Sequence, residues 1–231
     1  MAEGSVAVIT GAFGALGSVV ARSAAERGWR LALVDSAPAS GAPKGLAGDP
    51  LLLGGVDLTD AGAAAEAVGA AKARFGRLDA LLNIAGAFRW TTLEDSDAAV
   101  WDLLFRVNVQ TAANASRAAL PALKASGAGR IVNLGAGAAE RAAAGMGAYT
   151  AAKAGVHRLT ESLAEELKDA GVTVNAVLPS IIDTPQNRAD MPDAEFGRWV
   201  QPADLAEVIL FLASPQARAV TGALVRVPGR V

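Results

Sequence analysis

The chain's single tyrosine, Tyr149, stands four residues before Lys153. On a helix this spacing puts the phenol and the ammonium on one face. A free tyrosine titrates at about pH 10, so acid–base work near neutral pH requires its pKa to fall by roughly 3 units, or about 4 kcal/mol. An ammonium about 4 Å away supplies roughly that much at an effective dielectric of about 20. The pair therefore predicts a proton donor and acceptor, against the plainer interpretation of a half-buried aromatic residue beside a solvated lysine.

A glycine-rich turn at Thr10–Gly17 follows an apolar run and leads into an alanine-rich stretch. A strand, a tight turn and a helix in this order let the backbone approach a pyrophosphate, which the helix amides then face. Asp35 ends the next apolar run, where a carboxylate accepts hydrogen bonds from the hydroxyls of the adenine ribose and repels a 2′-phosphate. We therefore expect a dinucleotide site that prefers NAD(H) to NADP(H). Its contacts are predicted at Gly11, Phe13, Gly14, Ala15, Leu16, Gly17 and Asp35.

The elements that must position these residues alternate along the chain. Nearly continuous apolar runs, as in strands buried on both faces, predict seven strands: Ser5–Thr10, Arg30–Asp35, Leu51–Asp57, Asp79–Asn83, Arg130–Leu134, Val172–Val177 and Ala223–Val227. Longer alanine-rich stretches predict helices at Ala15–Gly28, Thr59–Phe75, Asp97–Ala125, Ala148–Ala170 and Pro202–Ser214. This alternation implies right-handed crossovers, and hence an α/β, doubly wound Rossmann-type fold: a seven-stranded parallel sheet with helices on both faces.

We find no internal repeat and no linker in the sequence, so residues 1–231 are predicted to form a single dinucleotide-binding domain. Ser180–Trp199 is the longest stretch without clear periodicity. Twenty irregular residues within a compact domain are typical of a functional segment rather than a plain connection. We therefore expect a substrate flap at about residues 180–200.

Composition excludes several kinds of chemistry. There are 21 Lys and Arg against 23 Asp and Glu, a net charge of −2, which argues against a nucleic-acid partner. The absence of cysteine excludes disulfides, a thiolate nucleophile and Cys-ligated zinc, and no cluster of metal ligands stands out. The longest uncharged stretch, Gly4–Ala21, is broken by glycines and is a poor membrane span, and Met1–Gly4 lacks the basic start of a secretory signal. We expect a cytoplasmic protein with a small-molecule substrate, no metal and no membrane partner.

Further motifs occur in the order found in the short-chain dehydrogenase/reductase family, which the chain resembles over essentially its whole length. They are Asp57-Leu58, Asn83-Ile84-Ala85-Gly86, Asn108, Tyr149-Thr150-Ala151-Ala152-Lys153 and Pro179-Ser180-Ile181-Ile182-Asp183-Thr184. The resemblance implies an enzyme that transfers hydride between NAD(H) and a carbonyl, alcohol or related conjugated substrate. It also implies a homodimer or homotetramer built through the helices predicted at Asp97–Ala125 and Ala148–Ala170.

The resemblance assigns roles to residues. Asp57 and Leu58 contact adenine; Asn83, Ala85 and Gly86 line the cofactor; Pro179, Ile182 and Thr184 hold the nicotinamide carboxamide. Tyr149 exchanges the substrate proton, Lys153 stabilises tyrosinate and bonds the nicotinamide ribose, and Asn108 holds a water that links Lys153 to solvent. Beyond the strand ends, where such sheets bind ligands, the substrate residues are expected to be Ala136, Met146 and Trp199. Phe88 and Trp90 fit either that substrate wall or ordinary packing, Arg188 either a substrate contact or a solvated charge, and His157 is expected to be structural.

Ala136 departs from the family pattern, which usually has a serine 13 residues before the tyrosine. Losing one donor to a developing oxyanion costs about 10²–10³ in rate. Three explanations stay open: a substrate that needs no such donor, a replacement such as Ser180, or lost catalysis. The NADH-specific dihydropteridine reductases dispense with this serine, and the chain resembles them at Gly14–Gly17, at Val156-His157 and in the flap. Two alternative functions are therefore the NADH-dependent reduction of quinonoid dihydropterin, and NAD binding by a catalytically weak sensor.

Overall fold

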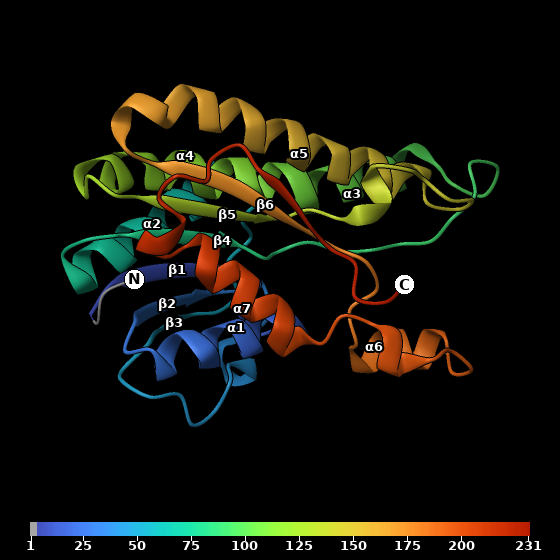
Figure 1. Cartoon of the computed structure of the whole chain (residues 1–231), viewed down its shortest axis with the longest axis horizontal. Helices are drawn as coiled ribbons and strands as arrows, with labels where there is room; N and C mark the ends of the chain where they lie inside the picture. Colours follow the sequence, from blue (N-terminus) through green and yellow to red (C-terminus); the bar gives the residue numbers. More distant parts are fainter. Residues whose placement is uncertain (1–3) are drawn as a thin grey trace.

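The structure, a computed structural model, describes residues 4–231. Its centre is a seven-stranded parallel sheet in the order β3-β2-β1-β4-β5-β6-β7 (Figure 1). The strands are β1 (Val6–Thr10), β2 (Arg30–Val34), β3 (Leu51–Leu53), β4 (Ala80–Asn83), β5 (Arg130–Leu134), β6 (Thr173–Pro179) and β7 (Leu224–Val227). The doubly wound α/β fold is thereby confirmed, and the central strands are buried on both faces, as their apolar character predicts.

Helices cover both faces of the sheet (Figure 1). They are α1 (Ala15–Glu26), α2 (Ala61–Phe75), α3 (Ala98–Phe105), α4 (Thr111–Ala125), α5 (Gly147–Leu167), α6 (Pro185–Asp190) and α7 (Pro202–Leu212). α1 and α7 share one apolar core with one face of the sheet, and α2, α4 and α5 share a second core with the other. Within residues 4–231 no helix combines the length and the apolar character needed to cross a membrane.

Three predicted segments differ from the observed ones by more than small shifts at their ends. The strand predicted at Leu51–Asp57 ends at Leu53, because the chain turns at Gly54 and Gly55. The helix predicted at Asp97–Ala125 is interrupted by a π-helical turn at Arg106–Gln110, which separates α3 from α4. The flap is not irregular throughout, since it contains α6 and a 3₁₀ turn at Phe196–Arg198, and α6 projects away from the body of the sheet (Figure 1).

Strand register brings the loops of the site together. β1 pairs with β2 on one side and β4 on the other, so Thr10 stands opposite both Val34 and Asn83. The chain order of the strands reverses at this point, and open α/β sheets bind ligands at such a switch, outside the carboxyl ends of the strands. The turns that follow β1, β2 and β4 therefore meet at one edge of the sheet.

Candidate active site

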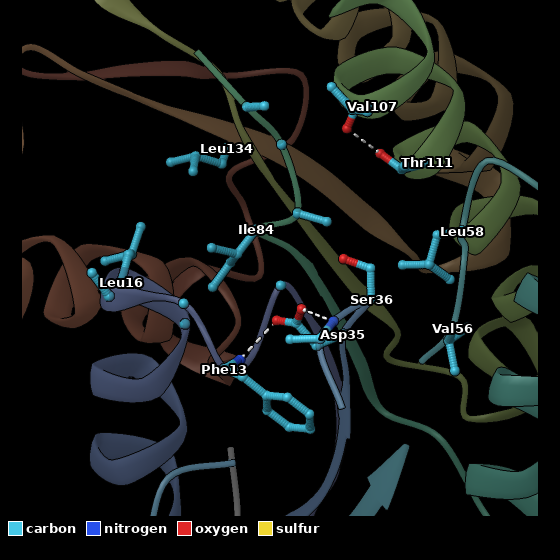
Figure 2. Close-up of a pocket in the computed structure, with 18 of the residues that line it drawn as sticks. Phe13, Leu16, Asp35, Ser36, Val56, Leu58, Ile84, Val107, Thr111 and Leu134 are labelled. Carbon is cyan, nitrogen blue, oxygen red and sulfur yellow. Dashed lines mark hydrogen bonds between the residues drawn. The ribbon is translucent and has the colours of Figure 1, made fainter. Parts of the chain in front are cut away.

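A cleft of about 520 Å³ opens where these turns meet. Twelve residues that were predicted to contact a dinucleotide line it: Gly11, Phe13, Gly14, Ala15, Leu16, Gly17, Asp35, Asp57, Leu58, Ala85, Gly86 and Ile182. Figure 2 shows Leu16, Ile84 and Leu134 on one side of the cleft and Val56 and Leu58 on the other, with Asp35 between Phe13 and Ser36. Apolar walls around two carboxylates, those of Asp35 and Asp57, suit a ligand with a flat ring and a hydroxylated sugar.

Two glycines of the first turn, Gly11 and Gly17, leave no space for side chains. Gly11 has φ +62°, and a Cβ there would lie 2.8 Å from the backbone of Ala85. A Cβ on Gly17 would lie 2.0 Å from the carbonyl oxygen of Gly11. The turn is therefore a backbone cradle at the start of α1, and such a cradle fits a pyrophosphate because the first helix amides have no partners within the helix.

Asp35 is held rigidly at the end of β2. Its two carboxylate oxygens accept the backbone amides of Phe13 and Ala37, each at 2.9 Å (Figure 2). No lysine or arginine of residues 4–231 lines the cleft. A fixed anion without a neighbouring cation suits two ribose hydroxyls and disfavours a phosphate group.

Thr10 and Asn83 support the turn that follows β4. The Thr10 hydroxyl accepts the amides of Ile84 and Ala85, both at 3.1 Å. Asn83 was expected to line the cofactor, but it is buried and does not line the cleft, because its amide donates across the sheet to Asn133 at 2.8 Å. Both side chains therefore support the wall of the cleft without lining it.

Tyr149 and Lys153 lie one turn apart on α5, as their spacing predicts. Lys153 is only 3% exposed, and its Nζ donates to the carbonyl of Leu134 at 2.7 Å. Burial raises the pKa of Tyr149 to about 12 and lowers the pKa of Lys153 to about 8. The expected lowering of the tyrosine pKa is thus not seen in this structure, since loss of hydration outweighs any effect of the ammonium.

Asn108 lies in the π-helical turn, and π-bulges often mark functional sites. It is 1% exposed; its Nδ2 donates to the carbonyls of Ala87 and Leu104, at 3.0 and 2.9 Å. A Cβ on Gly86 would lie 2.5 Å from Asn108 Oδ1 and 3.4 Å from Lys153 Nζ. The structure therefore brings Asn108 and Lys153 to the same glycine on the wall of the cleft.

Comparison with known proteins agrees with this geometry. The family model described as enoyl-(acyl carrier protein) reductase matches residues 11–229. A cis-4-hydroxycyclohexanecarboxylate dehydrogenase of Sinomonas cyclohexanicum is 37% identical, over 97% of this chain and 95% of its own. The chain belongs to the short-chain dehydrogenase/reductase family. It is accordingly an oxidoreductase of the short-chain dehydrogenase type.

Two solved structures of the same family share the fold. A 3-ketoacyl-(acyl-carrier-protein) reductase from Brucella melitensis, complexed with NADH, is 32% identical and superposes with a TM-score of 0.87, covering 99% of this chain and 98% of the other. A carveol dehydrogenase from Mycobacterium avium in complex with NAD is 26% identical with a TM-score of 0.85, covering 98% and 97%. Short-chain dehydrogenases bind nicotinamide cofactors, so the cleft is the expected place for one.

Phe88 and Trp90, from the loop after β4, contact Tyr149 and the loop before α5. Phe88 meets the ring of Tyr149 edge to face, with centroids 4.9 Å apart. Trp90 packs on Gly145, whose φ is +74°, and its indole donates to the carbonyl of Ala144 at 3.1 Å. Met146 precedes α5 in the same loop, so Trp90 ties the two loops that flank Tyr149.

The flap is braced by its own side chains. Arg188 forms an ion pair with Asp183 and lies over the ring of Phe196, 4.7 Å from its centroid. These contacts occupy Arg188, which was expected either to meet a substrate or to be solvated. Trp199 was expected on the substrate wall; it is 6% exposed and packs against Phe196. Thr184 caps α6 by accepting the amide of Asn187 at 3.2 Å.

Neither Pro179 nor Thr184 lines the cleft, although Ile182 between them does. Ser180, the possible substitute for the missing serine, donates its hydroxyl to the carbonyl of Pro228 at 2.7 Å. Ala136 is 4% exposed and brings only a methyl group. No group of three or more His, Cys, Asp or Glu in the described part of the chain is arranged to hold a metal ion.

Sequence reasoning missed nine residues that line the cleft: Ser36, Ala37, Val56, Thr59, Ile84, Ala87, Val107, Thr111 and Leu134. Most of them adjoin a predicted residue, so extending each motif by one or two positions would have found them. Val107 and Thr111 carry a weaker signal. They flank Asn108 in the π-helical turn and on α4, and only the altered helix geometry turns them toward the cleft.

Proposed function

We propose that the chain transfers hydride between NAD(H) and a small carbonyl, alcohol or related conjugated substrate. The observation that carries the proposal is Asp35, fixed by two backbone amides in a cleft that no lysine or arginine of residues 4–231 lines, with Lys153 of α5 close to Gly86 on the wall of the same cleft. We take residues 1–231 as one dinucleotide-binding domain with a substrate flap at about 180–200.

The residues of the cleft fit such a cofactor. The turn at Gly11–Gly17 would hold the pyrophosphate, Asp35 the adenine ribose, and Asp57 with Leu58 the adenine. Ala85, Gly86 and Ile182 would hold the nicotinamide end, with Asn83 supporting them. Pro179 and Thr184, which do not line the cleft, are proposed for the same end from the family resemblance alone. The bound dinucleotide supplies or accepts the hydride.

Tyr149 would exchange the proton. With its pKa raised to about 12, it carries its proton at neutral pH and can donate it to a carbonyl oxygen as hydride reaches the carbon. In the reverse direction the tyrosine must first lose that proton, and the Lys153 ammonium is the nearby cation that would stabilise the anion. Asn108 would hold the water through which Lys153 exchanges protons with solvent.

The substrate class follows from the aromatic side chains and from one relative. Phe88 packs against Tyr149, and Met146 precedes Tyr149 by three residues. Together with the proposed substrate residue Ala136, these side chains would favour an apolar or ring-shaped substrate. The Sinomonas relative is named for a hydroxycyclohexane carboxylate. Cyclic secondary alcohols and their ketones are therefore the first compounds to try.

Two alternatives are favoured by one observation, the methyl group of Ala136 where a hydroxyl is usual, with Ser180 occupied by Pro228. The first is NADH-dependent reduction of quinonoid dihydropterin, and the second is a catalytically weak NAD-binding sensor. A single assay separates them. Oxidation of NADH is followed with cyclic ketones, aldehydes, quinones and quinonoid dihydropterin in parallel. Turnover of the ketones supports the main proposal, turnover of the pterin alone supports the first alternative, and micromolar NADH binding without turnover supports the sensor.

The cofactor preference has its own test. Asp35→Ser removes the carboxylate but keeps a small polar side chain, so the ratio of kcat/KM for NADH to that for NADPH should fall about 10-fold or more, since a charged hydrogen bond contributes about 1.5–3 kcal/mol. Asp49→Ser, which removes an exposed carboxylate far from the cleft, is the control and should leave the ratio unchanged. A wild-type protein that prefers NADPH would refute the role given to Asp35.

We also propose a cytoplasmic homodimer or homotetramer that assembles through the α3–α4 segment and α5. Trp101, Leu103 and Phe105 of α3 are 38, 42 and 54% exposed, which leaves apolar surface for a second copy. Light scattering that gives a monomer mass at micromolar concentration would refute the assembly, and cell fractionation tests the location.

A further inference from the structure

Two side chains of α5, one helical turn apart, hold the backbone at the end of β5 and directly after it. Lys153 Nζ donates to the carbonyl of Leu134 at 2.7 Å, and His157 Nε2 accepts the amide of Ala136 at 3.4 Å. A donor and an acceptor on one helix face thus hold both ends of the segment Leu134–Ala136. This segment includes the position at which the family's serine is replaced.

The surroundings of His157 are shaped for its ring. The side chain is 3% exposed, and a Cβ on Gly135 would lie 2.7 Å from Nε2 and 3.0 Å from Leu178 Cδ1. Gly135 is fixed further by its amide, which donates to Val177 at 2.9 Å. Because Nε2 accepts a hydrogen bond, the ring is neutral with its proton on Nδ1.

We propose that His157 is a positioning residue that holds the segment Leu134–Ala136 in the conformation that Lys153 and the substrate require. The inference rests on the proposed function, because it assigns the held segment to the reaction. Without the acceptor, the buried Ala136 amide loses its partner, and α5 holds the segment only through the bond from Lys153 to Leu134. Displacements of about 1 Å around a reacting centre reduce rates about 10²-fold.

The position of His157 also makes the contact sensitive to pH. The charged groups that face it are Lys153, Arg158 and Glu161 of α5, Glu140 of the loop after β5 and, through an ion pair with Glu140, Arg226 of β7. Burial lowers the pKa of His157 below its ordinary 6.5, and the two cations of α5 act in the same direction while the two carboxylates oppose it. The ring is therefore an acceptor at neutral pH. Protonation at lower pH places an N–H against the Ala136 amide and breaks the contact.

Two variants separate the hydrogen bond from the filling of space. His157→Gln keeps an acceptor but cannot titrate, whereas His157→Leu fills similar space without an acceptor. Hydrogen exchange at the Ala136 amide, measured at neutral pH, should be about 10-fold or more faster in the Leu variant than in the wild type and close to wild type in the Gln variant. Equal protection in all three proteins would overturn the proposal, whether or not the protein turns over any substrate.

Kinetics then test whether the held segment serves the reaction. The Leu variant should lose about 10-fold or more in kcat with its KM for NADH within about 3-fold, and the Gln variant should recover most of the loss. Because His157 is the only histidine, its proton NMR signal in untagged protein titrates without ambiguity, and the acid-side fall of kcat should follow it. That fall should be absent in the Gln variant. The positioning role is overturned by a wild-type kcat in the Leu variant or by an unchanged acid-side fall of kcat in the Gln variant. If the wild-type protein turns over no substrate, the proposed function is refuted, and the hydrogen-exchange result alone decides whether His157 holds the Ala136 amide.

Discussion

On the proposed cofactor side of the site glycine backbone forms part of the walls, whereas on the proposed substrate side loops carry partly exposed aromatic side chains. A Cβ on Gly11, Gly17 or Gly86 would collide with neighbouring atoms at 2.8, 2.0 or 2.5 Å. Phe88 and Trp90 are 53 and 59% exposed. A shape made by backbone tolerates almost no substitution, while a wall made by side chains on loops can be altered residue by residue. Specificity should therefore be easier to change by substitutions in the aromatic loops than by substitutions in the glycine turns.

The same contrast holds for the groups that fix each side. Asp35 is bonded by backbone amides, and Thr10 likewise anchors two amides of the turn after β4. The flap depends instead on the Asp183–Arg188 ion pair and on the packing of Phe196 with Trp199. Changes on the cofactor side should therefore alter binding and structure together, and changes in the flap should alter substrate affinity alone.

Tyr149 stands between the two sides, and its removal should give the largest effect. Tyr149→Phe keeps the ring against Phe88 but removes the proton donor, so kcat should fall about 10²–10⁴-fold while the Kd for NADH stays within about 2-fold. Because the pKa of Tyr149 is raised to about 12, reduction by the wild type should stay level through neutral pH and decline only at alkaline pH. Stopped-flow and titration calorimetry measure the two quantities, and an active Phe variant would remove Tyr149 from the mechanism.

A pair of glycine substitutions tests the claim that the cofactor wall is backbone. Gly86→Ala places a methyl group against Asn108 Oδ1 and near Lys153 Nζ, so NADH affinity and kcat should each fall about 10-fold or more as the wall is displaced, at a cost of about 1–3 kcal/mol in stability. Gly69→Ala, on α2 with open space around it, should instead raise the stability by about 0.5–1 kcal/mol and leave kinetics unchanged. Equal results for the two variants would show that the wall is not limited by space.

Sequence reasoning was most accurate where local rules decide structure. The strand Arg130–Leu134 has its predicted bounds, and the glycine turn and Asp35 meet in one cleft as expected. It was least accurate where the structure depends on helix geometry or on contacts between residues that are far apart in the sequence. The π-helical turn at Asn108 was not predicted, since no residue type or spacing that we used is specific to i→i+5 hydrogen bonding.

Partners from other elements were equally invisible in the sequence. The Lys153 ammonium donates to a backbone carbonyl of β5. The Ser180 hydroxyl donates to the carbonyl of Pro228, which lies 48 residues further along the chain. Carbonyls are the same for every residue type, so no motif encodes which one a side chain will find. The raised pKa of Tyr149 has a similar origin, because burial depends on all the elements that pack around it.

The smallest effect is expected in the flap. Arg188→Gln removes the charge that bonds Asp183 and lies over Phe196, so the substrate KM should rise about 3-fold with kcat and NADH affinity unchanged.

Hydrogen bonds from Arg188 and Gln201 hold the pKa of Asp183 at about 2, below its ordinary 3.8. This contribution is present above pH 3.8 and is lost as pH falls toward 2, so hydrogen exchange in the flap should accelerate over that range in the wild type and be faster already at neutral pH in the variant. Lys168→Gln, which breaks the exposed pair with Glu165, is the matched control and should change neither quantity. If Arg188→Gln shifts NADH affinity as much as KM, the two sides of the site are coupled rather than separate.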